Sequence, residues 1–201
     1  MKTILQLNTS IFSNVGESTR LSNEFVEGFR NSHPDVKVIS RNLSENPVPH
    51  LTAEEFQAFL TKPEDRNTQQ KAVIEYSDSL INEIREADII LLGLPMYNFG
   101  VPSTLKSYFD HIARAGVTFR YTENGPVGLI ENKKVYVFAT RGGLYAGTPL
   151  DTQTNYVKDF LKFIGIQDVE FVYAEGLAMG VENKETAISK AKAAIHEQLA
   201  A

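Results

Sequence analysis

An unbroken apolar run over residues 89–94 is followed at once by a segment rich in aromatic residues, glycine and proline, residues 95–102. The run is typical of a strand buried on both faces of a sheet. Pro95 ends the strand because proline lacks a ladder donor, and Pro102 suits the first turn of a helix. We therefore expect a short, stiff, aromatic loop at the carboxyl end of a central strand, where open α/β sheets bind ligands.

Apolar runs alternate with helix-periodic segments along the whole chain. Such alternation predicts a parallel sheet with helices on both faces, and right-handed crossovers leave few topologies. The sequence predicts one α/β domain over residues 1–201, three-layered, with a five-stranded sheet in the order 2-1-3-4-5. The expected strands are residues 3–8, 36–39, 88–94, 134–139 and 169–174. The expected helices are residues 18–32, a helix capped by Asn67 or Thr68 with Val73, Tyr76, Leu80 and Ile84 on one face, and residues 102–115, 151–164 and 182–201.

Three local features add to this plan. Residues 43–67 contain three prolines and one short helix-like stretch, 53–60, and we interpret them either as a functional loop or as a surface excursion. Gly116 suits the position after a helix C-terminus. Asn124-Gly125, between two short β-like runs, predicts a hairpin, although Pro126 makes the signal imperfect.

Composition narrows the class of protein. The 201 residues carry a net charge of −5, which argues against nucleic acid and against an anionic membrane surface as partners. The chain has no cysteine, so disulfides, thiolate nucleophiles and cysteine-ligated metals are excluded. No stretch resembles a signal peptide or a membrane span, and we expect a cytoplasmic protein.

Three loops should converge at the switch point between the first and third strands. Residues 9–18 open a helix, whose free N–H groups favour an anion, and the serines there add hydroxyl donors. This suits one phosphate, because the glycine spacing of a dinucleotide fingerprint and the lysine of a P-loop are both absent. Ordinary helix capping is the alternative interpretation.

The other two loops suggest a flat ligand. Tyr97 and Phe99 would form walls, with backbone donors at Asn98 and Phe99, unless both rings belong to the core. The paired Gly142 and Gly143 would let N–H groups approach a ring carbonyl, unless they only form a strained turn. A phosphate pocket beside a flat, polar-edged slot matches the shape of flavin mononucleotide (FMN).

Segments 96–99, 114–126 and 141–143 also carry a family resemblance. They resemble the FMN-dependent NADH-azoreductases, flavodoxin-like NADH:quinone oxidoreductases once labelled acyl-carrier-protein phosphodiesterases. The similarity runs from end to end. It implies a flavodoxin-like fold and a homodimer with two FMN sites at the subunit interface. No G-x-S-x-G occurs, so the phosphodiesterase label has no chemical support.

The resemblance also implies the site residues. FMN contacts are expected from Ser10, Gly16, Glu17, Ser18, Met96, Tyr97, Asn98, Phe99, Thr140, Arg141, Gly142 and Gly143. The substrate would be walled by Phe119, Tyr121 and Tyr145. Glu17 stands where the family often has glutamine, and its carboxylate would repel a phosphate unless the side chain points away.

The implied activity is a ping-pong reduction. NADH reduces the flavin and leaves, and a planar aromatic substrate takes its place: a quinone becomes a hydroquinone, and an azo compound becomes two amines after two cycles. No acid–base residue is required, so no catalytic side chain is assigned, and the four scattered histidines predict no metal. One rival is a flavodoxin-type electron carrier, a flavin-binding protein without its own substrate. A receiver-type phosphate-binding protein fails because the strand ends lack a carboxylate cluster.

Overall fold

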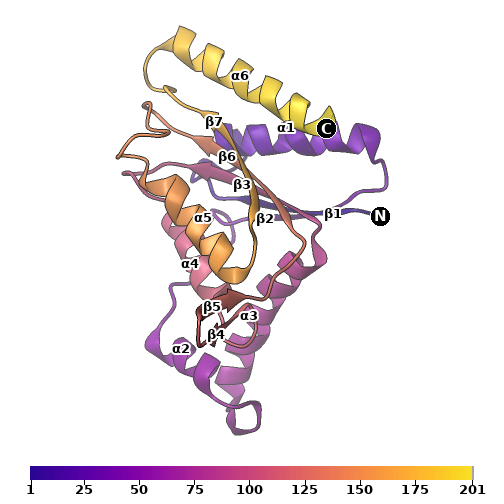
Figure 1. Cartoon of the computed structure of the whole chain (residues 1–201), viewed down its shortest axis with the longest axis vertical. Coiled ribbons are helices and arrows are strands. Elements are labelled where there is room, and N and C mark those ends of the chain that lie inside the picture. The colour runs from indigo at the N-terminus through magenta and orange to yellow at the C-terminus, as the bar shows by residue number, and fades with distance from the viewer. Residues whose placement is uncertain (201) are drawn as a thin grey trace.

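The computed structural model describes residues 1–200, which form a three-layer α/β/α domain (Figure 1). In chain order the elements are β1 (Thr3–Asn8), η1 (Ser13–Val15), α1 (Glu17–Ser32), β2 (Lys37–Asn42), α2 (Ala53–Leu60), η2 (Pro63–Asp65), α3 (Thr68–Glu86), β3 (Ile89–Pro95), α4 (Ser103–Ile112), β4 (Phe119–Thr122), β5 (Gly125–Gly128), β6 (Lys134–Thr140), α5 (Thr152–Ile164), β7 (Asp168–Ala174) and α6 (Val181–Ala200).

The main sheet is parallel with the order β2-β1-β3-β6-β7. Counted among the main strands this is 2-1-3-4-5, so the predicted topology is confirmed. The register pairs Asn8 with Gly93, Pro95 with Thr140, and Thr140 with Ala174. The carboxyl ends of the central strands therefore lie at one edge, from which the three loops of interest start.

Two cores cover the two faces of the sheet. Helices α1 and α6 cover one face and α3, α4 and α5 the other (Figure 1). Strands β1, β3 and β6 are buried along almost their whole length, as the apolar runs predicted. Phe25 and Phe138 lie in the core under α1, and Leu80, Tyr108 and Val157 in the other.

Helix α4 ends at Ile112, three residues earlier than predicted, and Gly116 does not cap it. The hydroxyl of Thr118 accepts a hydrogen bond from the Arg114 N–H at 2.9 Å and donates one to the Ile112 carbonyl at 2.6 Å. These bonds satisfy groups that a further helical turn would have used. Gly116 lies instead in a following turn at φ 77°.

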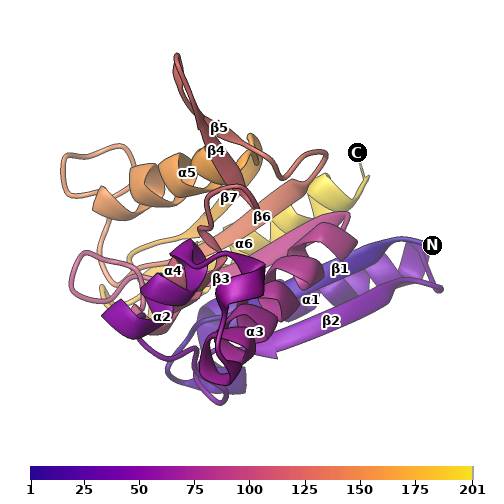
Figure 2. The same ribbon diagram turned by 90° about the horizontal axis from the view of Figure 1, so that it is seen from below.

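The hairpin β4–β5 is present, but its turn is not Asn124-Gly125. Thr122 pairs with Gly125, so the turn residues are Glu123 and Asn124. The hairpin is a two-stranded ribbon that projects from the body of the domain (Figure 2). Pro126 is tolerated because both strands of this two-stranded ribbon are edge strands.

The other differences are small. The short helix over 53–60 is confirmed as α2. Asn67 caps α3 with a capping box, and β2 runs from Lys37 to Asn42. Of the face predicted for α3, Leu80 and Ile84 are buried, whereas Val73 and Tyr76 are not. The buried face consists of Ile74, Ser77, Leu80, Ile81 and Ile84. Among residues 1–200, the helices are all too short or too polar to cross a bilayer.

Candidate functional site

The loops after β1 and β3 are joined directly at the carboxyl edge of the sheet. The Ile11 N–H donates a hydrogen bond to the Tyr97 hydroxyl at 3.2 Å, and Ser10 Oγ lies 3.5 Å from the same oxygen. The Met96 N–H donates to the carbonyl of Thr140 at 2.9 Å, which joins the loop after β3 to the loop after β6. The three predicted loops therefore meet at one edge (Figure 1).

The first loop presents free donors at the start of α1. A Cβ atom on Gly16 would lie 2.2 Å from Ser10 Oγ, so only glycine lets these two segments pack. No side chain caps α1 in the described chain. Ser18 Oγ and Thr19 Oγ1 are buried without a hydrogen-bond partner among residues 1–200. Orphaned hydroxyls beside a helix N-terminus fit a bound phosphate.

The side chain of Glu17 pairs with cations of the same surface. Its carboxylate lies 2.7 Å from Lys184 Nζ and 3.5 Å from Arg20 Nη1. These cations offset the negative charge that would otherwise repel a phosphate at the helix start. A side-chain contact from Glu17 to FMN stays a prediction, and the ion pairs argue for a backbone role.

The second loop is a two-residue turn. Tyr97 and Gly100 exchange two backbone hydrogen bonds of 3.1 and 3.0 Å, and Asn98 and Phe99 between them have φ values of 49° and 62°. The N–H groups of Asn98 and Phe99 donate to no group of the described chain. Both N–H groups are therefore free of acceptors among residues 1–200, and their contact with a ligand stays a prediction.

A residue that the sequence reasoning missed supports this turn. The buried Gln153 on α5 donates through Nε2 to the carbonyls of Pro95 at 2.9 Å and Gly100 at 3.2 Å. Both ends of the turn are thereby fixed to α5. A lone glutamine within a helical pattern carries no signal that would have revealed this role.

The third loop turns its carbonyls toward the segment after β7. The carbonyls of Arg141, Gly142 and Gly143 accept hydrogen bonds from the N–H groups of Leu177, Ala178 and Gly176. The N–H groups of Gly142 and Gly143 donate to nothing within residues 1–200. They are free for the polar edge of a flat ligand, where they would stabilise negative charge.

Arg141 turns its side chain away from these donors and under the loop. The guanidinium is fully buried and contacts Asp151 Oδ1 at 2.8 Å, Thr154 Oγ1 at 2.9 Å and Glu175 Oε1 at 3.1 Å. Burial opposes ionisation of Asp151, yet hydrogen bonds from Arg141 and Thr154 hold the pKa of this carboxyl below its usual value. A contact of Arg141 with FMN through its side chain would require this cluster to open.

The three residues predicted to contact the substrate lie in two separate parts of the chain, one at the loops and two on the hairpin. Tyr145 lies at the site, with its ring centroid 5.5 Å from that of Phe99 in an edge-on arrangement. Phe119 is buried and packs on Phe163, at a centroid distance of 4.2 Å, whereas Tyr121 is 72% exposed. Their hairpin contacts Gly165 at the far end of α5 from the loops (Figure 2). A 13-residue helix spans about 20 Å, so within one chain the hairpin does not reach the site.

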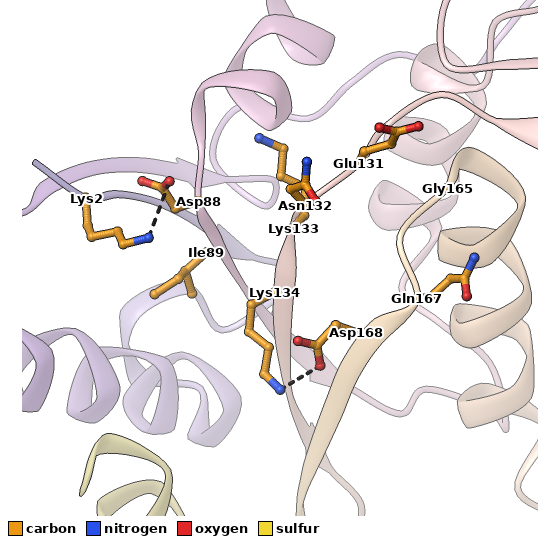
Figure 3. A pocket seen from close by; sticks show the side chains of 10 residues that line it. All are labelled: Lys2, Asp88, Ile89, Glu131, Asn132, Lys133, Lys134, Gly165, Gln167 and Asp168. Carbon is orange, nitrogen blue, oxygen red and sulfur yellow. Dashed lines mark hydrogen bonds and ion pairs between the residues drawn. The ribbon is translucent and has the colours of Figure 1, made fainter. Parts of the chain in front are cut away.

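A hollow of about 710 Å³ at the opposite edge of the sheet is not a rival site (Figure 3). It lies where β3, β6 and β7 begin, and each of its charged side chains except Glu131 has an ion-pair or hydrogen-bond partner. Lys134 contacts Asp168 and Glu170, Lys2 contacts Asp88, and Lys133 donates to two carbonyls at the end of α3. No group of three or more metal-ligating side chains occurs in the described part of the chain.

A family model described as flavodoxin-like fold matches residues 2–199. The chain belongs to this family. An FMN-dependent NADH:quinone oxidoreductase of Cellvibrio japonicus is 53% identical over 201 residues, which is 100% of both chains. A relative of the same name from Alcanivorax borkumensis is 53% identical over 94% of this chain and 96% of its own. The resemblance found in the sequence is thus confirmed.

Solved structures agree. A crystal structure of an azoreductase from Bacillus anthracis superposes with a TM-score of 0.90 at 26% identity, covering 99% of each chain. A second structure from that organism, an FMN-dependent NADH-azoreductase in complex with FMN, gives 0.87 at 25% identity over 99% of this chain and 100% of its own. The free donors and orphaned hydroxyls described above fit FMN as the group bound here.

Proposed function

We propose that this protein is an FMN-dependent oxidoreductase that uses NADH to reduce quinones to hydroquinones and azo compounds to amines. One observation carries the proposal: three loops meet at the switch point and leave four backbone N–H groups and two buried hydroxyls without partners among residues 1–200. These donors match a ligand with one phosphate and a flat ring that has a polar edge. The names of the relatives point to the same cofactor and donor.

When bound, FMN supplies the redox chemistry by taking two electrons from NADH and giving them to the acceptor. The residues of this chain bind and orient. The α1 N-terminus with Ser18 would hold the phosphate, and the N–H groups of Asn98 and Phe99 would bind the ring. The N–H groups of Gly142 and Gly143 would donate to its polar edge and stabilise negative charge there. The Phe99 and Tyr145 rings, which contact each other edge-on, would lie beside the bound ring.

We further propose a homodimer in which the hairpin of one subunit completes the site of the other. Tyr121 and Val127 on the hairpin are exposed, as are Phe56 and Leu60 on α2. Such apolar side chains on projecting elements favour a protein interface. The partner's hairpin would bring Tyr121, with Phe119 behind it, over the flavin. Since NADH is the donor, we expect the dimer to work in the cytoplasm.

The test is direct. Purified protein should be yellow or become so with added FMN, lose its flavin absorbance when NADH is added without oxygen, and regain it with a quinone. Sedimentation should give twice the mass of the 22.4 kDa chain. A protein that binds FMN but is not reduced by NADH would instead be an electron carrier, and one that cannot bind FMN would contradict the proposal.

A further inference from the structure

A partly buried carboxylate that the sequence did not single out lies behind the loop that carries Tyr145. Glu175 directly follows β7, and its side chain is only 14% exposed. A single oxygen, Oε1, accepts three hydrogen bonds: from Arg141 Nη1 at 3.1 Å and from the N–H groups of Tyr145 and Ala146 at 2.9 Å each. All three donors belong to the loop that carries Tyr145, two through backbone N–H groups and one through the Arg141 side chain.

These bonds fix the backbone from which the Tyr145 ring projects. With its N–H held by Glu175, Tyr145 places its ring over Gly143, so that a Cβ atom on Gly143 would be 2.7 Å from the Tyr145 hydroxyl. The edge of the ring contacts Phe99. Gly142 and Gly143 depend less on Glu175, because their carbonyls are held by the N–H groups of Ala178 and Gly176.

Arg141 in turn holds Glu175. The guanidinium is anchored independently by Asp151, which caps α5, and by Thr154 on α5. The Glu175 carboxylate is therefore held by Arg141 as well as by the two backbone N–H groups of the loop. The bond from Arg141 to Glu175, at 3.1 Å, pairs opposite charges and orients the carboxylate. The arrangement couples a buried ion pair to the position of one exposed aromatic ring.

We propose that Glu175 is a positioning residue that acts through Tyr145 on the binding of the acceptor and leaves the binding of FMN nearly unchanged. The proposal rests on the proposed function, because it assigns Tyr145 to the acceptor side of the site. It separates two tasks within one loop: Gly142 and Gly143 serve the cofactor, and Glu175 with Tyr145 serves the substrate.

The experiment compares Glu175→Ala, Glu175→Gln and a matched control, Glu170→Ala. Glu170 lies on β7, the strand that precedes Glu175, but contacts Lys134 at the opposite edge of the sheet. Glu175→Ala should raise the KM for a quinone about tenfold, with kcat changed less than about twofold and FMN affinity changed less than about twofold. Glu175→Gln keeps an oxygen acceptor for both N–H groups and should restore most of the KM. Glu170→Ala should match the wild type.

Two further measurements separate positioning from a structural role. In the FMN-free protein, amide hydrogen exchange at Tyr145 and Ala146 should be faster in Glu175→Ala than in the wild type and normal in Glu175→Gln. In a Tyr145→Ala background, Glu175→Ala should raise KM no further, because the residue through which it acts is gone.

The proposal is overturned if the effects on KM add in the double variant, if Glu175→Ala alters KM no more than Glu170→Ala, or if it only lowers Tm. It is also overturned if FMN affinity falls as much as KM rises. Failure of the proposed function would look different: the wild type would not bind FMN or would not oxidise NADH. The exchange measurement would still decide whether Glu175 positions Tyr145.

Discussion

At the scale of single residues, the candidate site contains positions with unusual steric or backbone requirements. Gly16 is required by its distance to Ser10, and Phe99 adopts a left-handed conformation, φ 62°, that a bulky residue seldom takes. Such features persist where the surrounding structure fixes them, and they gather at ligand sites. Each suggests a substitution that separates binding from folding.

Gly16→Ala should weaken FMN binding by at least about tenfold, because the new methyl group would displace Ser10 from the phosphate end of the site. Titration of the FMN-free protein with FMN, followed by flavin fluorescence, measures this. Gly100→Ala is the matched control, since a Cβ atom there would lie 3.7 Å from the nearest atom outside its neighbours, the Tyr97 carbonyl oxygen. Equal affinities for the two variants would contradict the assigned role.

Phe99→Gly and Phe99→Ala should raise the KM for quinones alike, because both remove the ring. Their stabilities should differ. Alanine keeps the left-handed strain and glycine relieves it, so the glycine variant should have the larger free energy of unfolding, by about 1 kcal/mol. Urea denaturation of the two proteins tests the difference. An alanine variant as stable as the glycine variant would show that the turn is not strained.

At the scale of elements, hydrophobic periodicity predicted the strands and helices that apolar packing determines. It missed the element ends and buried faces that depend on single polar contacts. The strands and their order followed from apolar runs such as residues 89–94. The end of α4 did not, because it depends on one hydroxyl, that of Thr118. Half of the predicted face of α3 is buried, Leu80 and Ile84. The other half is not, and Ser77 is buried instead, where its hydroxyl donates to the His111 carbonyl.

The site followed the same rule. The convergence of the loops, and the glycines whose N–H groups have no acceptor in the described chain, were predicted because these residues lie next to strand ends. Gln153 and Glu175 were not, because their partners lie up to 58 residues away and only the folded sheet brings them together. Residues that contact a ligand leave local signals in sequence, whereas residues that hold those contacts in place do so through tertiary structure.

Helix α4 buries the hydroxyl of Tyr108 without giving it a hydrogen-bond partner in the described chain. Tyr108 is fully buried, its oxygen has no hydrogen-bond partner in the described chain, and burial raises its pKa far above the usual value. Tyr108→Phe should therefore keep or increase the free energy of unfolding, by up to about 1 kcal/mol. Tyr173→Phe is the contrast, because the Tyr173 hydroxyl lies 3.0 Å from Thr154 Oγ1 and its loss should destabilise. Thermal unfolding ranks the pair, and the reverse order would refute the argument.

Helix α5 begins at a carboxylate whose pKa is lowered on folding. The ordinary value for Asp151 is 3.8 and the folded value is lower, so its ionised form adds stability above about pH 3.8 that is lost as the pH falls through the folded pKa. Asp151→Asn keeps a capping oxygen but removes the charge. It should cost about 1–3 kcal/mol at pH 7 and progressively less below pH 3.8. Urea denaturation at pH 7 and pH 3 measures the gap, and a gap independent of pH would contradict the pairing with Arg141.

At the scale of the whole molecule, the candidate site lies away from the hairpin of the same chain. Its loops lie at one end of α5 and the exposed Tyr121 lies on a hairpin at the other. A projecting hairpin with no contact to its own site is difficult to explain in a monomer. In a two-fold dimer the same hairpin can cover the partner's site, and each partner covers the other.

Mixing two defective proteins tests this arrangement. Gly16→Ala impairs the FMN loops and leaves the hairpin intact, whereas Tyr121→Ser leaves the loops intact and impairs the hairpin. In a heterodimer one site combines both defects and the other combines the two intact parts. After subunit exchange of equal amounts, about a quarter of all sites should be complete by random pairing. Quinone reduction at low substrate should then rise above the mean of the two parents. If Tyr121 served the site of its own chain, every site in the mixture would keep one defect and no activity would return.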